Sequence, residues 1–364
     1  MTKNHIPSLN GLRAISIILV IGSHLYRHHF FSDNVFVSYT KLWLFNGALG
    51  VNVFFIISGF LITTLLIKER ENTGRISFKN FYLRRTIRIF PAYYFLLLVY
   101  VVLQLNGLMH LNARDWLSDV TYTKQFFPNG DNETGHLWSL SVEEVFYLIW
   151  PIVFIKSKRY SVPIIWFLIS IITIARMFQY TYPIPELVNT IFSTGDSLLI
   201  GCLFAINYNK IVSFVSRMGN WNILLFPAIM FSIYIFAHLY YLSSVNLNHT
   251  RSFFNLSVFQ TLSYSLLGNI GLLTNLLIGL MIVYSINLKS LWSRFLNLPV
   301  LEYFGKLSYS LYLWQQLFTQ DKNAFHKIPS LALVLFIFLA ACFSYYLIEK
   351  PFIRLKVRYA VFKS

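Results

Sequence analysis

The stretch "GLRAISIILVIGSH", residues 11–24, is almost entirely apolar apart from Arg13 and His24. Eleven positions at about 100° each make roughly three turns, so both side chains share one helix face about 16 Å apart. That distance is about half of the hydrocarbon thickness of a bilayer. If Arg13 lies at one edge of the hydrocarbon core, His24 therefore lies near the midplane of the bilayer. Because an ionisable group inside a membrane is expensive, the stretch predicts a spanning helix with a polar partner or pathway.

The composition extends this interpretation to the whole chain. Of the 364 residues, 56% are hydrophobic and 12% are charged, and the mean hydropathy is +0.57. A soluble domain carries about 25% charged residues. Apolar runs of about 20 residues are too long for the short alternating strands of a membrane barrel. The sequence therefore predicts an all-α polytopic membrane protein with one integral membrane domain over residues 1–364.

Charge sets the predicted orientation. With a cytoplasmic N-terminus, Lys and Arg number roughly 22 in the inner segments against about seven in the outer ones, so both termini are predicted inside. This asymmetry accounts for most of the net charge of +16, and no nucleic-acid partner is needed. The longest outer loop, about 107–136, is expected to be irregular because of its Pro, Gly and Asn content. Hydropathy predicts about ten spans: 9–29, 45–67, 88–106, 137–155, 161–180, 187–207, 221–242, 262–286, 301–320 and 328–349.

Several polar side chains are predicted at the depth of His24. Glu143 and Glu144 lie roughly 9–10 Å below the outer end of their span, within a few ångströms of that level. Gln315 reaches a similar height, and Asp196 also lies well inside the membrane. A histidine beside a carboxylate can take a proton from a hydroxyl. Two interpretations stay open: a catalytic group, or polar side chains that only pair with one another and stabilise the bundle.

The motif "RRTIR" places Arg84, Arg85 and Arg88 at the inner start of the third predicted span. Arg85 and Arg88 are three residues apart and share a helix face, a fork suited to phosphate oxygens. Juxtamembrane arginines are equally common as topology anchors and lipid-headgroup contacts. An anion site at the cytosolic mouth combined with a base at mid-membrane suits acyl-coenzyme A, whose phosphorylated head carries a long thin arm.

Other residues carry a structural and a functional interpretation side by side. The glycines of "GALGVNVFFIISGF" indicate close helix packing, and Asn52 within it is a possible lining residue. Trp138 and Tyr309 fit interfacial belts and packing, or stacking against a sugar acceptor. Gln315 fits an interhelical hydrogen bond equally well. Cys202 and Cys342 lie within apolar runs, so no disulfide is indicated. We predict no metal site.

The motifs together resemble the membrane-bound acyltransferase 3 family, whose members acylate surface glycans and other acceptors. The matching stretches follow the family's order and cover nearly the whole chain. They are Arg13 with His24 after ten intervening residues, "GVNVFFIISGFL", "RRTIRIFPAYY", "LWSLSVEEVFYLIWP", and "GKLSYSLYLW" followed by "YYLIEKPF".

The resemblance implies about ten spans and an acyl-coenzyme A donor on the cytosolic side. It also implies roles for specific residues: catalysis by His24 with Arg13, an active-region carboxylate at Glu143 or Glu144, and donor contacts at Arg85 and Arg88.

Two departures from the family pattern matter. Many relatives have a histidine after "SYSLYLW", where this chain has Gln315, so a second catalytic histidine at that position is excluded. Relatives that pass the acyl group to an extracellular hydrolase-like domain carry that domain after the last span. The sequence given ends at Ser364. A stand-alone form is therefore expected, which completes the transfer itself or relies on a separate protein.

The sequence thus predicts an O-acyltransferase of a bacterial cytoplasmic membrane, transferring groups other than amino-acyl groups. Acetyl-coenzyme A is the expected donor substrate, with no tightly bound cofactor. The expected acceptor is a hydroxyl of a cell-surface or lipid-linked glycan, and His24 acts as general base. Membrane lipids are the other expected contacts. Two rival hypotheses are a transporter of acyl groups or glycans that makes no bond, and a structural scaffold in which His24 serves stability alone.

Overall fold

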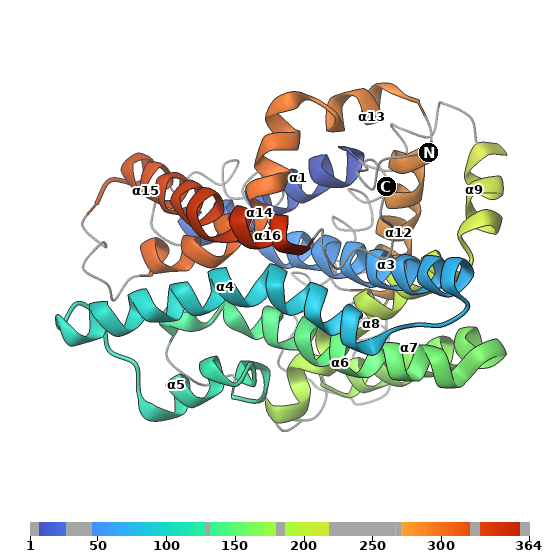
Figure 1. The fold of residues 1–364 in the computed structure, drawn as a ribbon, viewed down its shortest axis with the longest axis horizontal. Helices are drawn as coiled ribbons and strands as arrows, with labels where there is room; N and C mark the ends of the chain where they lie inside the picture. The colour runs from blue at the N-terminus through green and yellow to red at the C-terminus, as the bar shows by residue number, and fades with distance from the viewer. Residues whose placement is uncertain are drawn as a thin grey trace, which may run out of the picture.

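A computed structural model describes residues 7–26, 46–127, 132–179, 186–217, 266, 271–287, 289–320 and 328–356. Within these ranges the chain forms helices and turns, with no strand (Figure 1), which confirms the all-α prediction there. The longer helices are α1 (Pro7–Tyr26), α3 (Gly47–Thr73), α4 (Phe78–Leu105), α5 (Ala113–Val120), α6 (Leu137–Ser157), α7 (Ser161–Gln179), α8 (Glu186–Ile206), α9 (Tyr208–Arg217), α12 (Leu272–Asn287), α14 (Pro299–Thr319) and α15 (Ser330–Phe343). Short elements are 3₁₀ turns Lys124–Phe126, Asn132–Thr134 and Lys158–Tyr160, helix α13 (Leu291–Leu296), a π-helical segment Ser344–Glu349 and helix α16 (Lys350–Lys356).

Five of the described helical stretches are long and apolar enough to cross a membrane: α1, α3, α4, α6 and residues Leu331–Leu355. A sixth is present if α8 and α9, which meet at an angle of 83°, count as one broken span. Helices α7 and α12 are apolar but shorter. The chain is therefore a polytopic membrane protein, while the number of ten spans stays a prediction. The predicted span 221–242 and the start of 262–286 lie outside the described residues.

Helix α4 begins ten residues before the predicted boundary, at Phe78 instead of residue 88. The Ser77 side chain caps it by accepting a hydrogen bond from the Asn80 main-chain N–H at 3.3 Å. The preceding helix, α3, ends at Gly74, whose φ of 71° is the left-handed conformation common after a helix. The arginines of "RRTIR" consequently lie inside a helix, on successive turns, where their side chains can face the bundle.

The predicted irregular loop at 107–136 is only partly irregular in its described residues. It contains α5 and two 3₁₀ turns. The Lys124 ammonium, in a side chain only 3% exposed, lies 2.5 Å from Asp115 and 3.5 Å from Asp119. The loop composition did not reveal this ordering, because the pairing of buried charges depends on contacts across the segment.

Close packing of α3 against its neighbours holds the centre of the structure (Figure 1). A Cβ atom at Gly59 would overlap the Leu198 carbonyl of α8, and one at Gly201 would overlap the Ile56 carbonyl of α3. Only glycine lets the two backbones approach this closely. The packing interpretation of the second-span glycines is thus confirmed. Gly50 is similarly placed against the Ser16 carbonyl of α1, and Gly47 lies against the Ser23 side chain of that helix.

An ion pair links α7 and α8 inside the bundle. The Arg176 guanidinium lies 2.7 Å from the Asp196 carboxylate, and both side chains are fully buried. Asn275 of α12 donates a hydrogen bond to the same carboxylate at 3.3 Å. For Asp196, the structure therefore supports the pairing interpretation over a catalytic one, since its charge is matched within the protein.

We expect Gly201→Val to lower the stability of the folded protein by about 1–3 kcal/mol, because the added side chain forces α8 away from α3. Thermal unfolding in detergent measures this. Leu98→Ala, at a side chain 58% exposed on α4, is the control and should change the unfolding temperature little. Equal effects of the two substitutions would contradict the close-packing account.

Candidate active site

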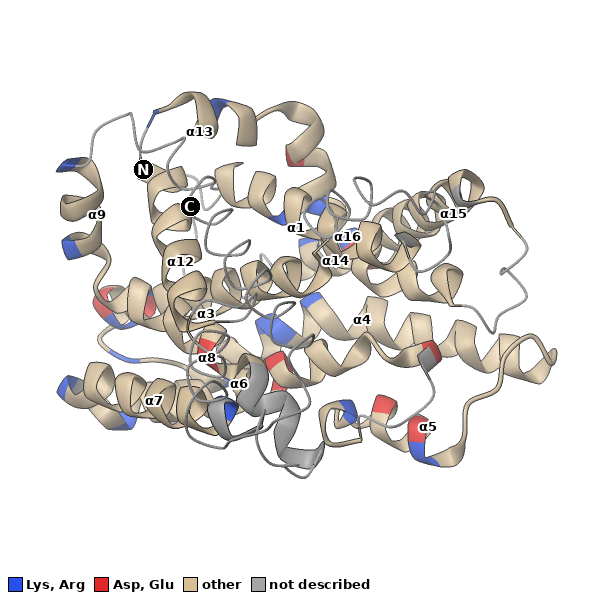
Figure 2. Ribbon diagram, turned by 180° about the vertical axis from the view of Figure 1, so that it is seen from behind, with Lys and Arg blue, Asp and Glu red and all other residues tan. Residues whose placement is uncertain are grey.

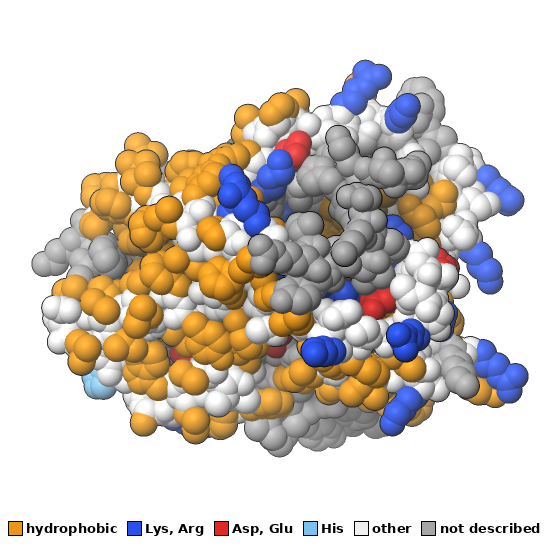
Figure 3. Space-filling model, in the orientation of Figure 1, with side chains coloured by type: hydrophobic (Ala, Val, Ile, Leu, Met, Phe, Trp, Pro, Cys, Tyr) orange, Lys and Arg blue, Asp and Glu red, His pale blue; other side chains and the backbone are white. Residues whose placement is uncertain are grey.

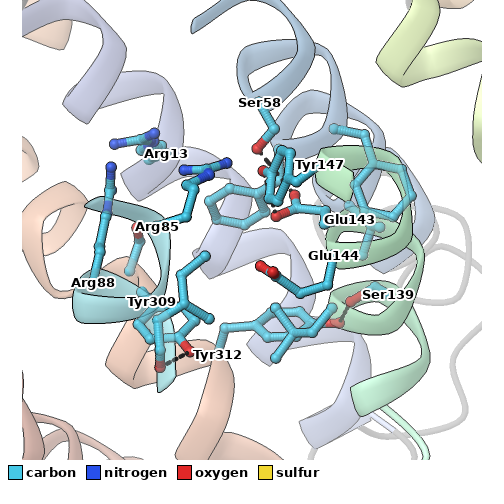
Figure 4. A pocket seen from close by; sticks show the side chains of 16 residues that line it. Arg13, Ser58, Arg85, Arg88, Ser139, Glu143, Glu144, Tyr147, Tyr309 and Tyr312 are labelled. Atoms are coloured by element: carbon cyan, nitrogen blue, oxygen red, sulfur yellow. Dashed lines mark hydrogen bonds between the residues drawn. The ribbon is translucent and has the colours of Figure 1, made fainter. Parts of the chain in front are cut away.

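A cavity of about 90 Å³ lies between α1, α3, α4, α6 and α14. Its charged lining comes from distant parts of the sequence: Arg13, Arg85, Arg88, Glu143 and Glu144. Figure 4 shows the three arginines gathered on one side of the cavity, with the two glutamates opposite them. The structure therefore brings together five of the predicted site residues, from α1, α4 and α6.

The two adjacent glutamates have different surroundings. The Glu143 carboxylate accepts hydrogen bonds from the Ser58 hydroxyl at 3.0 Å and from the Tyr147 hydroxyl at 2.9 Å. The Arg85 guanidinium stacks 3.6 Å above the centre of the Tyr147 ring. Glu144, in contrast, makes no hydrogen bond or ion pair with any described residue. Glu143 thus anchors the arginine side of the site, whereas the Glu144 carboxylate remains available to a ligand.

His24 does not line this cavity. Its Nδ1 lies 2.5 Å from the Gln315 side-chain oxygen of α14. A carbonyl oxygen only accepts, so in this orientation of the amide the hydrogen is on Nδ1 and Nε2 can accept a proton. The side chain that orients His24 in the structure is thus Gln315, as the interhelical interpretation of Gln315 predicted.

The glutamates lie in the cavity with Arg13, although the depth estimate grouped them with His24. That estimate counted residues along straight helices, and it neglected which charges attract one another. Because a carboxylate inside a membrane is costly unless a cation is near, the arginines of α1 and α4 decide where α6 places these side chains.

Three other predicted residues lie outside the cavity. Arg84 pairs with Glu69 at 2.7 Å near the α3–α4 connection. The fully buried Asn52 accepts a hydrogen bond from Ser197 of α8 at 3.3 Å. Trp138 of α6 packs edge-on against the Phe55 ring of α3, with the ring centres 6.1 Å apart. Each of these residues joins two helices in the structure.

Tyr309 lines the cavity, and its hydroxyl donates to the Ile89 carbonyl at 2.9 Å. Tyr312 lies one turn further along α14. It also lines the cavity and lies 2.5 Å from the Ser139 hydroxyl. Its hydroxyl donates to the His136 carbonyl at 3.0 Å. Sequence periodicity puts Tyr309 and Tyr312 on one face, but only the structure shows that this face meets the cavity.

Two further ionisable residues near the site were missed. His136 is buried, and its Nε2 bonds to the Leu313 carbonyl at 3.0 Å. Glu349, in the π-helical segment, accepts a hydrogen bond from Ser310 at 2.9 Å and lies within electrostatic range of Arg88. The signal for Glu349 was present in "YYLIEKPF", a carboxylate that ends a long apolar run. π-Helical turns are often found at functional sites.

Residues 6–349 match a family model described as an acyltransferase domain. The chain belongs to this acyltransferase family. All five stretches that carried the resemblance lie within the matched range or begin there, which confirms the family prediction.

Curated relatives extend the comparison. The chain is 28% identical over 376 residues to the O-acetyltransferase OatA of Staphylococcus aureus strain NCTC 8325, covering 96% of this chain and 57% of that protein. A protein of strain COL that is provisionally named an O-acetyltransferase is 29% identical over 382 residues, with the same coverage. The chain thus spans 57% of the length of these relatives. No solved structure matches the chain significantly.

We expect Glu143→Gln to destabilise the protein by about 1–3 kcal/mol, because it removes the charge facing Arg85 and leaves polar partners poorly satisfied. Glu144→Gln should lower the unfolding temperature less, since this carboxylate makes no hydrogen bond or ion pair with a described residue. Thermal unfolding of both variants in the same detergent tests the distinction. A larger loss for Glu144→Gln would show that the two side chains have been assigned the wrong way round.

Proposed function

We propose that this chain is a membrane O-acetyltransferase that moves an acetyl group from acetyl-coenzyme A to a hydroxyl of a cell-surface or lipid-linked glycan. The observation that carries the proposal is the cavity of an acyltransferase-family chain in which three arginines face two glutamates. The O-acetyltransferase names of the relatives support acetyl as the transferred group.

Arg13, Arg85 and Arg88 are the proposed contacts for the anionic donor, because guanidinium groups bind phosphate oxygens bidentately. The cavity of about 90 Å³ takes roughly six to nine non-hydrogen atoms if each needs about 10–15 Å³. A space of this size admits one phosphate group of the donor beside the arginines, so the rest of the donor extends outside it. Arg84 pairs with Glu69 outside the cavity, and we leave it out of the donor site.

His24 is the proposed general base. The acceptor hydroxyl attacks the thioester carbon, so that a C–O bond forms and the C–S bond breaks. Nε2 of His24 takes the hydroxyl proton, and coenzyme A leaves as the thiol after protonation. Glu144 is the proposed partner of the positive charge that develops on His24. A covalent acyl-histidine is the alternative chemistry, and trapping an acyl group on His24 with donor alone would overturn direct attack.

The proposed location is a bacterial cytoplasmic membrane, with about ten spans and both termini cytoplasmic. Exposed basic side chains lie on the α3–α4 connection, at the α6–α7 junction and on α9, and these three places share one end of the molecule (Figures 1 and 2). Hydrophobic side chains dominate the opposite part of the face in Figure 3. Such an asymmetry supports a cytoplasmic position for the basic end.

The competing function is a transporter that moves an acyl group or glycan without making a bond. Purified protein in nanodiscs, supplied with labelled acetyl-coenzyme A and a glycan acceptor, separates the two hypotheses. Net transfer of label to the acceptor supports the enzyme. Flux of label without bond formation in sealed vesicles supports the transporter.

We expect Arg88→Ala to raise the KM for acetyl-coenzyme A by about tenfold or more, since it removes a charged hydrogen bond to the donor. Lys79→Ala, an exposed cation in the first turn of the same helix, is the matched control and should leave KM unchanged. Arg84→Ala should lower thermal stability more than it changes KM, because its partner is Glu69. Equal KM values for Arg88→Ala and Lys79→Ala would show that Arg88 does not bind the donor.

We expect His24→Ala to lower the transfer rate by about 10²–10⁴-fold at matched membrane abundance, because general base catalysis contributes that much. The measurement is the O-acyl ester content of surface glycans in cells lacking the gene and complemented with each variant. His110→Ala, at an exposed histidine between α4 and α5, is the control and should restore the ester fully. If His24→Ala also restores it, His24 is not the base.

A further inference from the structure

Helix α5 has its polar and apolar sides reversed relative to a surface helix in water. Asp115, Ser118 and Asp119 are fully buried, whereas Leu117 is 64% and Val120 is 47% exposed. In water, such a helix would expose its apolar side and bury its charges at a cost. Surrounded by hydrocarbon, the same arrangement is favourable.

The charges inside this segment are paired with one another. Lys124 contacts Asp115 at 2.5 Å, Asp119 at 3.5 Å and the Thr134 hydroxyl at 2.8 Å. Ionisable groups at membrane depth point inward and pair in this way. The cluster therefore keeps Asp115, Asp119 and Lys124 away from lipid, whereas Arg114 in the first turn of α5 is exposed.

Hydrogen bonds to α4 show how far the segment reaches back along that helix. The Tyr94 hydroxyl donates to the Val120 carbonyl at 3.0 Å, and the Tyr93 hydroxyl donates to the Asp119 carbonyl at 2.7 Å. Helix α4 ends at Leu105, eleven residues beyond Tyr94, which is about 16 Å along the axis. If Leu105 lies at the edge of the hydrocarbon core, which is about 30 Å thick, the end of α5 lies near the middle of the core. Figures 1 and 2 both show α5 beside the C-terminal half of α4.

The exposed side of α5 is continuous with the lipid-facing side of α4. Tyr94, Leu98, Val102 and Leu105 lie on one face of α4 and are 39%, 58%, 51% and 81% exposed. Because Tyr94 of this face bonds to the Val120 carbonyl, Val120 adjoins the same surface.

The backbone after α5 is satisfied within the protein, as required at membrane depth. The N–H of Tyr122 bonds to the Asp119 carbonyl at 3.3 Å, and that of Thr123 bonds to the Ser118 carbonyl at 2.8 Å. Tyr122 has a φ of 55°, where glycine is usual at this position after a helix. Its ring stacks on Tyr93 at 4.0 Å, which holds the turn against α4.

The turn also reaches the level of the cavity. The Tyr122 ring stacks on Phe90 with the ring centres 5.3 Å apart. Phe90 follows Ile89, which lines the cavity and accepts the hydrogen bond of Tyr309. The tip of the segment therefore lies behind the cavity wall formed by α4 and α14.

We propose that residues 106–127 form a re-entrant element that enters the leaflet at the C-terminal end of α4 and presents Leu117 and Val120 to lipid hydrocarbon. Under the proposed orientation this is the outer leaflet. The segment returns beside α4 to the depth of the cavity, instead of forming the aqueous loop that its composition suggests. The partner of this surface is the acyl chains of membrane lipids.

The test is the environment of a fluorophore on Leu117→Cys, in full-length protein that carries Cys342→Ala and retains the buried Cys202. The protein is labelled with a nitrobenzoxadiazole dye and reconstituted into nanodiscs. Quenching by lipids brominated on their acyl chains reports hydrocarbon, and quenching by iodide reports water. Leu98→Cys on α4 is the lipid control, and Lys79→Cys is the water control. Val120→Cys serves as a second position if labelling at Leu117 disturbs folding.

We expect brominated lipids to quench Leu117→Cys as strongly as Leu98→Cys, with iodide leaving its emission intact. Quenching by iodide at the level of Lys79→Cys would overturn the proposal in favour of an aqueous loop. Protection from both quenchers would overturn it in favour of a protein covering this surface. None of these results depends on acyltransferase activity, so the outcome is independent of the proposed function.

Discussion

The high cost of unpaired charge in hydrocarbon is the constraint on which this structure depends. Three compact sets of ionisable groups lie inside the described part of the bundle. One set gathers arginines of α1 and α4 opposite the glutamates of α6, another joins α7 to α8, and a third fills the interior behind α5. Each set holds helices together because separating its members would expose a charge to lipid.

Helix packing makes the first of these sets possible. Gly59 and Gly201 let α3 and α8 touch at the backbone, and Gly50 does the same between α3 and α1. Because α3 is held closely on both sides, Ser58 can reach Glu143 on α6. These glycines have no side chain that takes part in the proposed chemistry. By setting the helix spacing, they help to bring Ser58 and Glu143 into contact.

The cavity and His24 divide the proposed chemistry between two places. The cavity supplies the positive charge that suits an anionic donor, and its Glu144 makes no hydrogen bond or ion pair with a described residue. His24 is oriented by Gln315 of α14. Many relatives have a histidine at the position of Gln315. An amide can orient an imidazole without competing for its proton, so a single base is sufficient in this arrangement.

The sequence by itself determined the membrane class, the helical fold and the family, because hydropathy and motif order are local properties that need no contacts. It also predicted that Arg85 and Arg88 share a face, since helix periodicity fixes that relation. Only the tertiary structure separated Glu143 from Glu144 and placed Arg84 outside the cavity. It also turned a predicted loop into an ordered segment beside α4. These outcomes depend on which charged groups and hydroxyls of different helices come into contact. The energy of each such pair is set by the distance between its members and by their burial, and neither quantity can be read from the linear sequence.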